Sequence, residues 1–133
     1  MQDVILLTGA GQIGLAIARR MGHGKKIVVS DKNINNAQTV TKIMAEAGFD
    51  AVAVEADISS RKSILNMIAA AQKYGEIAML INAAGVSPSQ ASVETILKVD
   101  LYGTAVLLEE VGKVIKAGGT GVTTVSYTHL RAH

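Results

Sequence analysis

The sequence predicts an α/β fold, a doubly wound parallel sheet with helices on both faces. Short, uninterrupted apolar runs alternate along the chain with segments whose apolar residues recur at helical spacing. Glycines separate most of these segments, as expected where strands and helices end. The chain has 133 residues, of which 49% are hydrophobic and 18% are charged, so it can form the core of one small domain.

Five apolar runs predict the strands. A parallel strand is covered on both faces, so its residues are apolar without alternation. The predicted strands are 4–7, 27–29, 51–54, 77–81 and a fifth that begins at 122–125. We expect the order 3-2-1-4-5 in a sheet that is truncated after about five strands.

Apolar residues at helical spacing predict four helices between these strands. The first follows the glycine-rich segment 9–14, carries Ile13, Ile17 and Met21 on one face, and ends at Gly22. The others are predicted at 37–47, at 64–71 with Ser59 or Ser60 as the N-cap, and at 92–116.

The segment from Gly9 to Gly14 (the glycine loop) has the spacing GxGxxG, follows a buried strand and opens a helix. In that context Gly9 allows a tight turn, Gly11 lets a pyrophosphate approach the backbone, and Gly14 lets the helix pack closely on the strand. The N–H groups and dipole of the helix N-terminus favour phosphate. The motif predicts a dinucleotide site, and the alternative is a structural turn between strand and helix.

Asp31 stands at the end of the second strand, 17 residues after Gly14. A carboxylate there accepts hydrogen bonds from the adenosine ribose and repels a 2′-phosphate, so it favours NAD over NADP. Lys32 follows directly and can compensate, so NADP stays possible. The alternative is an ordinary turn aspartate.

Composition excludes several other classes of protein. The chain has no Cys, which excludes disulfides, Cys-ligated zinc, iron–sulfur clusters and thiol nucleophiles. The basic residues are scattered and exceed the acidic ones by only two, so we expect no nucleic-acid partner. No apolar run has the ~18 residues of a membrane span, and we expect a cytoplasmic protein without membrane contact. His23 lies in a Gly-rich loop without a second ligand nearby, so no metal site is expected.

Three motifs in register, over residues 3–124, resemble the short-chain dehydrogenase/reductase family. They are Thr8-Gly9-x-Gly11-x-x-Gly14, Asp57-Ile58-Ser59 after the third strand, and Asn82-Ala83-Ala84-Gly85 after the fourth. The resemblance implies a Rossmann-type fold. It also implies hydride transfer between a nicotinamide cofactor, NAD or NADP, and a small alcohol or carbonyl substrate.

The resemblance also implies roles for individual residues. Asp57 would contact the adenine ring with Ile58 beside it, although a plain alternative for Asp57 is the N-cap of the following helix. Asn82 and the residues after it would line the cofactor and steady the central strand, or Asn82 could satisfy backbone groups of the loop. The expected cofactor-binding set is Gly9, Gly11, Gln12, Ile13, Gly14, Asp31, Asp57, Ile58, Asn82, Ala83, Ala84 and Gly85.

The sequence departs from the family pattern in three places. The glycine loop is one residue shorter than the common TGxxxGxG form. Asp100 stands where the similar V-N-L-x-G motif has Asn, and a carboxylate cannot donate the hydrogen bonds of an amide. No Tyr is followed four residues later by Lys, so no catalytic residue is assigned and the chain itself is expected to be inactive.

Two other functions stay open. The shorter glycine loop and Asp100 would suit a non-catalytic NAD(P)-binding sensor or scaffold. An extended-type family member acting on nucleotide sugars, an epimerase or dehydratase, would share the same first half.

The last nine residues, 125–133, change character abruptly and read VSYTHLRAH. They are the translation of GTC TCT TAT ACA CAT CTC CGA GCC CAC, which resembles a transposase-type sequencing adapter. We therefore expect a dinucleotide-binding domain at 1–124, the N-terminal half of a longer protein, followed by a non-native tail. The resemblance implies a homo-oligomer, because in the family one face of the helix around residues 100–116 packs against a second subunit.

Overall fold

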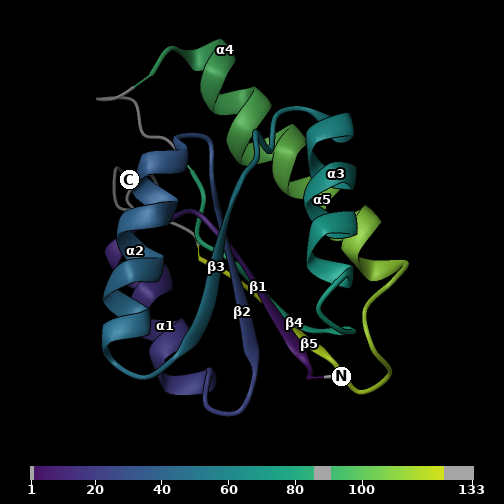
Figure 1. Cartoon of the computed structure of the whole chain (residues 1–133). Coiled ribbons are helices and arrows are strands. Elements are labelled where there is room, and N and C mark those ends of the chain that lie inside the picture. The colour runs from purple at the N-terminus through teal and green to yellow at the C-terminus, as the bar shows by residue number, and fades with distance from the viewer. Residues whose placement is uncertain (1, 86–90, 125–133) are drawn as a thin grey trace, which may run out of the picture.

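The computed structural model describes residues 2–85 and 91–124. Five parallel strands form one sheet in the order β3-β2-β1-β4-β5, which confirms the predicted order (Figure 1). The strands are β1 (Val4–Thr8), β2 (Lys26–Asp31), β3 (Asp50–Glu55), β4 (Ile77–Asn82) and β5 (Thr120–Thr123).

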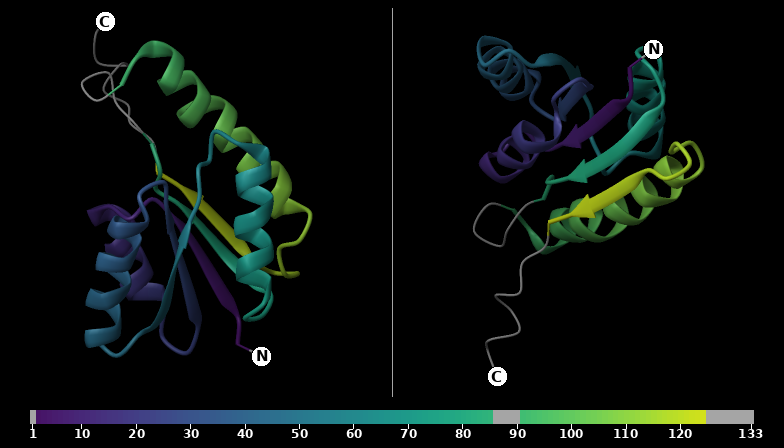
Figure 2. Two further views of the ribbon diagram at one scale, coloured as in Figure 1. Left: turned by 45° about the horizontal axis from the view of Figure 1, so that its top comes forward. Right: turned by 90° about the horizontal axis from the view of Figure 1, so that it is seen from below.

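Helices cover both faces of the sheet. Helices α1 (Gln12–Met21) and α2 (Ile34–Glu46) lie on one face, and α3 (Arg61–Gln72) and α5 (Thr104–Gly112) lie on the other (Figure 1). Figure 2 shows α4 (Val93–Ile96), the π-helical segment η1 (Leu97–Gly103) and α5 as one continuous helix. None of the helices within the described residues is long and apolar enough to cross a membrane.

The central strand β1 divides the core into two layers because successive side chains of a strand point to opposite faces. Val4 and Leu6 pack with residues of α3 and α5, and Ile5 and Leu7 pack with residues of α1 and α2. All four side chains are fully buried. A strand covered on both faces is apolar throughout, which is why the sequence pattern found it.

The predicted apolar face of the first helix is wrong. Ile13 and Met21 are 62% and 42% exposed, and the buried residues of α1 are Gly14 and Ala18. The helix lies so close to the sheet that a Cβ on Gly14 would come within 2.7 Å of Leu7 Cδ1. Only small residues fit at the closest contact, so Ile13 and Met21 face outward, whereas Ile17 of the predicted face is partly buried and packs against the core.

The fourth predicted helix and several boundaries also differ. The helix at 92–116 ends at Gly112 and contains the seven π-helical residues of η1. Within η1, Gly103 packs against the backbone of Ile58, whose carbonyl oxygen would lie 2.6 Å from an added Cβ. Asn82 belongs to β4 and not to the following loop, and β5 begins at Thr120.

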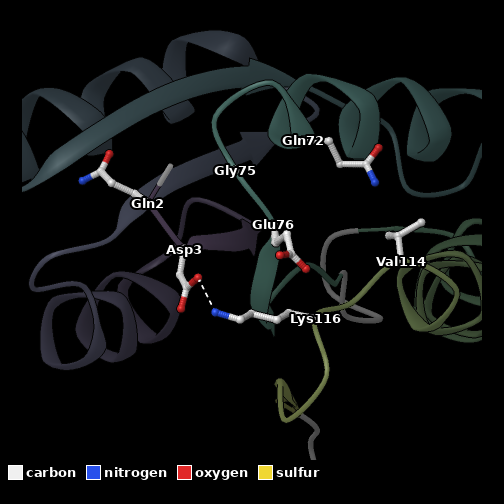
Figure 3. Close-up of a pocket in the computed structure, with 7 residues that line it drawn as sticks. All are labelled: Gln2, Asp3, Gln72, Gly75, Glu76, Val114 and Lys116. Atoms are coloured by element: carbon white, nitrogen blue, oxygen red, sulfur yellow. Dashed lines mark hydrogen bonds and ion pairs between the residues drawn. The ribbon is translucent and has the colours of Figure 1, made fainter.

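The N-terminal ends of the strands carry a separate polar cavity of about 430 Å³ (Figure 3). Lys116 Nζ lies 2.8 Å from Asp3 Oδ1 and joins the start of β1 to the turn before β5. The hydrogen bond to Asp3 raises the pKa of Lys116. The side chains of Lys116 and Asp3 are 42% and 38% exposed, so solvent screens this ion pair and it adds little stability.

The close contact at Gly103 predicts the effect of a methyl group there. Gly103→Ala should lower the free energy of unfolding by about 2 kcal/mol because the helix or the loop at Ile58 must move. Gly112→Ala is the matched control, since nothing lies within 4 Å of its Cβ and alanine favours a helix by up to ~1 kcal/mol. Urea unfolding measures both, and equal stability of the two variants would contradict the contact.

Candidate functional site

The carboxyl ends of four neighbouring strands surround a cavity of about 420 Å³. In doubly wound sheets this edge, where the strand order reverses about β1, is where ligands bind. The cavity is lined by residues that end or follow β1, β2, β3 and β4 and by two residues of the α4–η1 helix: Thr8, Gly9, Ala10, Gly11, Ser30, Asp31, Lys32, Asn36, Ala56, Asp57, Ile58, Ala83, Ala84, Gly85, Thr95 and Val99.

The glycine loop lies directly on the chain that follows β4. Gly9 has a φ of +89°, and a Cβ there would lie 2.6 Å from backbone atoms of both Ala83 and Ala84. Only glycine combines that conformation with that contact. The Gly9 amide donates to the Ser30 carbonyl oxygen at 2.8 Å, so the loop is also bonded to the end of β2.

Asp31 connects three segments at the mouth of the cavity. Its Oδ2 accepts a hydrogen bond from the Ala10 amide at 3.0 Å, and its Oδ1 accepts one from the Asn33 amide at 2.8 Å. Asn33 in turn caps α2, with its side chain accepting from the Asn35 amide. The predicted ribose-binding carboxylate is therefore fixed by backbone donors on both sides.

Asp57 sits in a tight turn before α3. Its Oδ1 accepts hydrogen bonds from the Ser59 amide at 2.9 Å and the Ser59 hydroxyl at 2.6 Å. The hydroxyl bond is the largest cause that lowers the pKa of Asp57. The Ser59 amide and the charge of Lys32 act in the same direction, against the effect of burial. The N-cap of α3 is Ser60, so the alternative of Asp57 as that cap is wrong.

Asn82 points into the protein. It is 1% exposed, its Oδ1 accepts from the Thr8 hydroxyl at 2.6 Å, and its Nδ2 donates to the Thr104 hydroxyl at 3.5 Å. The Asn82 carbonyl oxygen also accepts from the Thr124 amide. These bonds join β1, β4 and α5, so Asn82 steadies the sheet beneath the cavity and does not line it.

The structure brings together eight of the twelve predicted cofactor residues around the cavity. Gln12 and Ile13 are exposed on the first turn of α1, Gly14 faces Leu7, and Asn82 is buried below. The eight that line it are Gly9, Gly11, Asp31, Asp57, Ile58, Ala83, Ala84 and Gly85.

Eight lining residues lie outside the predicted cofactor-binding set: Thr8, Ala10, Ser30, Lys32, Asn36, Ala56, Thr95 and Val99. Asn36 was open to prediction because it lies in the first turn of the helix after β2. Thr95 and Val99 carry no such signal, since their place depends on the path of the α4–η1 helix. Asp100, on the same helix, has its Oδ1 3.2 Å from where a Cβ on Gly85 would lie, at the edge of the cavity.

Metal ligands are absent from the described part of the chain, where no group of three or more His, Cys, Asp or Glu side chains could hold an ion. His23 is exposed, and its ring centroid lies 4.9 Å from that of Phe49.

Comparison with known proteins shows which family the chain resembles. The family model for short chain dehydrogenase matches residues 3–129, which include the first five residues of the predicted tail. The short-chain dehydrogenase/reductase bsc3 of Alternaria brassicicola is 39% identical over 121 residues, 91% of this chain and 44% of that protein. A putative ketoacyl reductase of the granaticin polyketide synthase of Streptomyces violaceoruber is 37% identical over 97 residues, 70% of this chain and 35% of that protein.

Solved structures show the same fold. An actinorhodin polyketide ketoreductase variant, solved with NADPH, is 30% identical with a TM-score of 0.79, over 94% of this chain and 53% of that one. A short chain dehydrogenase from Mycobacterium smegmatis has a TM-score of 0.86 at 24% identity, over 99% and 61% of the two chains. The chain thus spans about half the length of the proteins it matches. Because the family model covers almost the whole sequence, the chain belongs to the short-chain dehydrogenase family.

Proposed function

We propose that the chain is the dinucleotide-binding part of an NAD(P)-dependent oxidoreductase that acts on an alcohol or carbonyl substrate. The observation that carries the proposal is the cavity at the carboxyl ends of the strands, where the glycine loop meets Asp31 and Asp57. The relatives bsc3 and the granaticin reductase, both named as reductases, support the reaction class.

Each part of the cavity suits one part of a dinucleotide. The first amides of α1 lack acceptors within their helix and favour the pyrophosphate. Asp31 accepts from the adenosine ribose, and Asp57, beside Ile58, accepts from the adenine amino group. Ala83, Ala84 and Gly85 form the wall across from the loop. The bound nicotinamide would supply or accept the hydride.

The proton-transfer residues are not assigned on this chain. It contains no Tyr-x-x-x-Lys, and Asp100 at the edge of the cavity, when ionised, only accepts hydrogen bonds. We propose that the Tyr and Lys belong to a longer gene product and that residues 125–133 are not native.

Association of two copies is part of the proposal. Along the α4–η1–α5 helix, Leu97, Leu101 and Leu108 are 52%, 66% and 48% exposed at spacings of four and seven residues. We propose that these exposed leucines, which lie partly within the predicted segment 100–116, contribute to the surface between two subunits.

The source gene tests the assignment of function directly. Sequencing it from unfragmented DNA should show other residues from about position 125 and a Tyr-x-x-x-Lys downstream. The whole gene product should oxidise or reduce members of an alcohol and ketone panel with a nicotinamide cofactor, whereas the 133-residue chain should turn over none. A gene without the Tyr and Lys would favour a non-catalytic sensor. Recovery of VSYTHLRAH from the gene would contradict the proposal that residues 125–133 are not native.

Cofactor preference tests Asp31. The chain should bind NAD about tenfold or more tightly than NADP because the carboxylate repels a 2′-phosphate. Asp31→Ala should narrow that ratio. Calorimetry measures both affinities, and Glu55→Ala is the control, since Glu55 is exposed and lies next to Asp31 in the register of β2 and β3. Equal affinities of the unmutated chain for NAD and NADP would show that Asp31 does not select between the two cofactors.

Acid pH tests the Asp57–Ser59 turn. Because the folded pKa of Asp57 is lowered, the ionised carboxylate stabilises the fold above its unfolded pKa, and this is lost as the pH falls through the folded pKa. Ser59→Ala should raise that pKa and lower the free energy of unfolding by about 1 kcal/mol at pH 7.

The destabilisation by Ser59→Ala should disappear as the pH falls through the lowered folded pKa of Asp57, because below that pKa the carboxyl is protonated in both proteins. Carboxyl NMR titration and urea unfolding measure the two effects. Ser59→Thr keeps the hydroxyl and should behave as the unmutated chain. A destabilisation that does not change with pH would mean that the hydroxyl acts independently of the Asp57 charge.

A further inference from the structure

Asp31 accepts hydrogen bonds from backbone amides that lie before and after its own strand in the chain. One carboxylate oxygen accepts from Ala10, 21 residues earlier in the glycine loop, and the other accepts from Asn33, two residues later. Hydrogen bonds to an ionised acceptor are about twice as strong as neutral ones. The contact with Ala10 is partly buried, so water competes with it less than at an open surface.

The glycine loop depends on such bonds for its shape. Two successive amides, of Gly9 and Ala10, bond to the last two residues of β2, Ser30 through its carbonyl and Asp31 through its carboxylate. Gly9 is also fixed by packing, but nothing lies within 4 Å of a Cβ placed on Gly11. Glycine has the most backbone freedom of any residue, so with no packing on its Cβ side Gly11 depends on backbone hydrogen bonds, those beside it and the one that its carbonyl oxygen accepts from the Leu15 amide.

We propose that Asp31 is a positioning residue for the phosphate site as well as the ribose-binding residue. By accepting the Ala10 amide it sets the course of the loop into α1 and leaves the amides of Gly11 and Gln12 at the helix N-terminus for the phosphates. This inference rests on the proposed dinucleotide function. It means that one carboxylate couples cofactor selection to phosphate affinity, so removing it weakens binding even of ligands that have no ribose hydroxyls.

Two nucleotides separate the two roles of Asp31. Adenosine diphosphate carries both ribose hydroxyls, and 2′,3′-dideoxyadenosine diphosphate carries neither. Asp31→Ala should weaken both by about tenfold or more, the loss expected for one charge-assisted hydrogen bond. Asp31→Asn keeps one acceptor oxygen and should lose less affinity for the dideoxy nucleotide than Asp31→Ala does. Glu55→Gln removes a nearby exposed charge and should change neither affinity.

Amide hydrogen exchange of the ligand-free chain gives an independent measurement. In Asp31→Ala the Ala10 amide should exchange about tenfold faster, because it loses its acceptor. The Gly9 amide is the internal control, since its acceptor is the backbone oxygen of Ser30 and is not removed. An unchanged Ala10 rate, with weaker binding of adenosine diphosphate alone, would overturn the positioning role and leave Asp31 as a ribose-binding residue.

Failure of the dinucleotide proposal gives a different result. If the unmutated chain binds neither nucleotide nor NAD, the proposed function fails, and the positioning role falls with it whatever the exchange rates. If the unmutated chain binds both nucleotides and Asp31→Ala binds the dideoxy form equally well, only the positioning role is overturned.

Discussion

The close approach of the glycine loop to the backbone after β4 is the constraint on which the site depends. Gly9 fits against Ala83 and Ala84 because it has no side chain, and Gly14 lets α1 settle on Leu7 for the same reason. Together these contacts bring the N-terminus of a helix to the edge of the sheet. Main-chain donors and the carboxylates of neighbouring strands then face one cavity without any long side chain to hold them there.

Both carboxylates at this edge of the sheet, Asp31 and Asp57, accept hydrogen bonds from backbone amides. Asp31 ends β2 and Asp57 follows the neighbouring strand β3, and each accepts a hydrogen bond from an amide of its own turn. The hydroxyl of Ser59 is the largest cause that lowers the pKa of Asp57, and the Ser59 amide acts in the same direction. The Thr8–Asn82–Thr104 bonds act below this layer and lock the two central strands to α5. Thr8 both lines the cavity and bonds to Asn82 beneath it, so the polar groups of the site and those of the core are connected through Thr8.

The strand pattern and the site motifs were open to prediction, and the packing of single helices was not. Buried parallel strands are apolar at every position, so the sheet order was predictable from the sequence. Of the eight lining residues that were predicted, three followed from the glycine motif and the spacing to Asp31, and five from the resemblance to the family. The orientation of α1 did not follow. Its apolar periodicity pointed to Ile13 and Met21, whereas the close contact with β1 selected Gly14 and Ala18. Sequence periodicity reports which residues are hydrophobic, whereas the close contact between α1 and the sheet admits only small side chains.

The π-helical turns of η1 contain more residues per turn than the α-helix on either side. Such a segment takes up one residue more than a regular α-helix would, so the residues on its two sides keep their facing. If the same residues formed a regular α-helix, everything before the segment would turn by about 100° relative to α5. Thr95, on the far side of the segment from α5, would then turn away from the cavity together with α4. This wall of the cavity therefore depends on the one residue that the π-helical turns absorb.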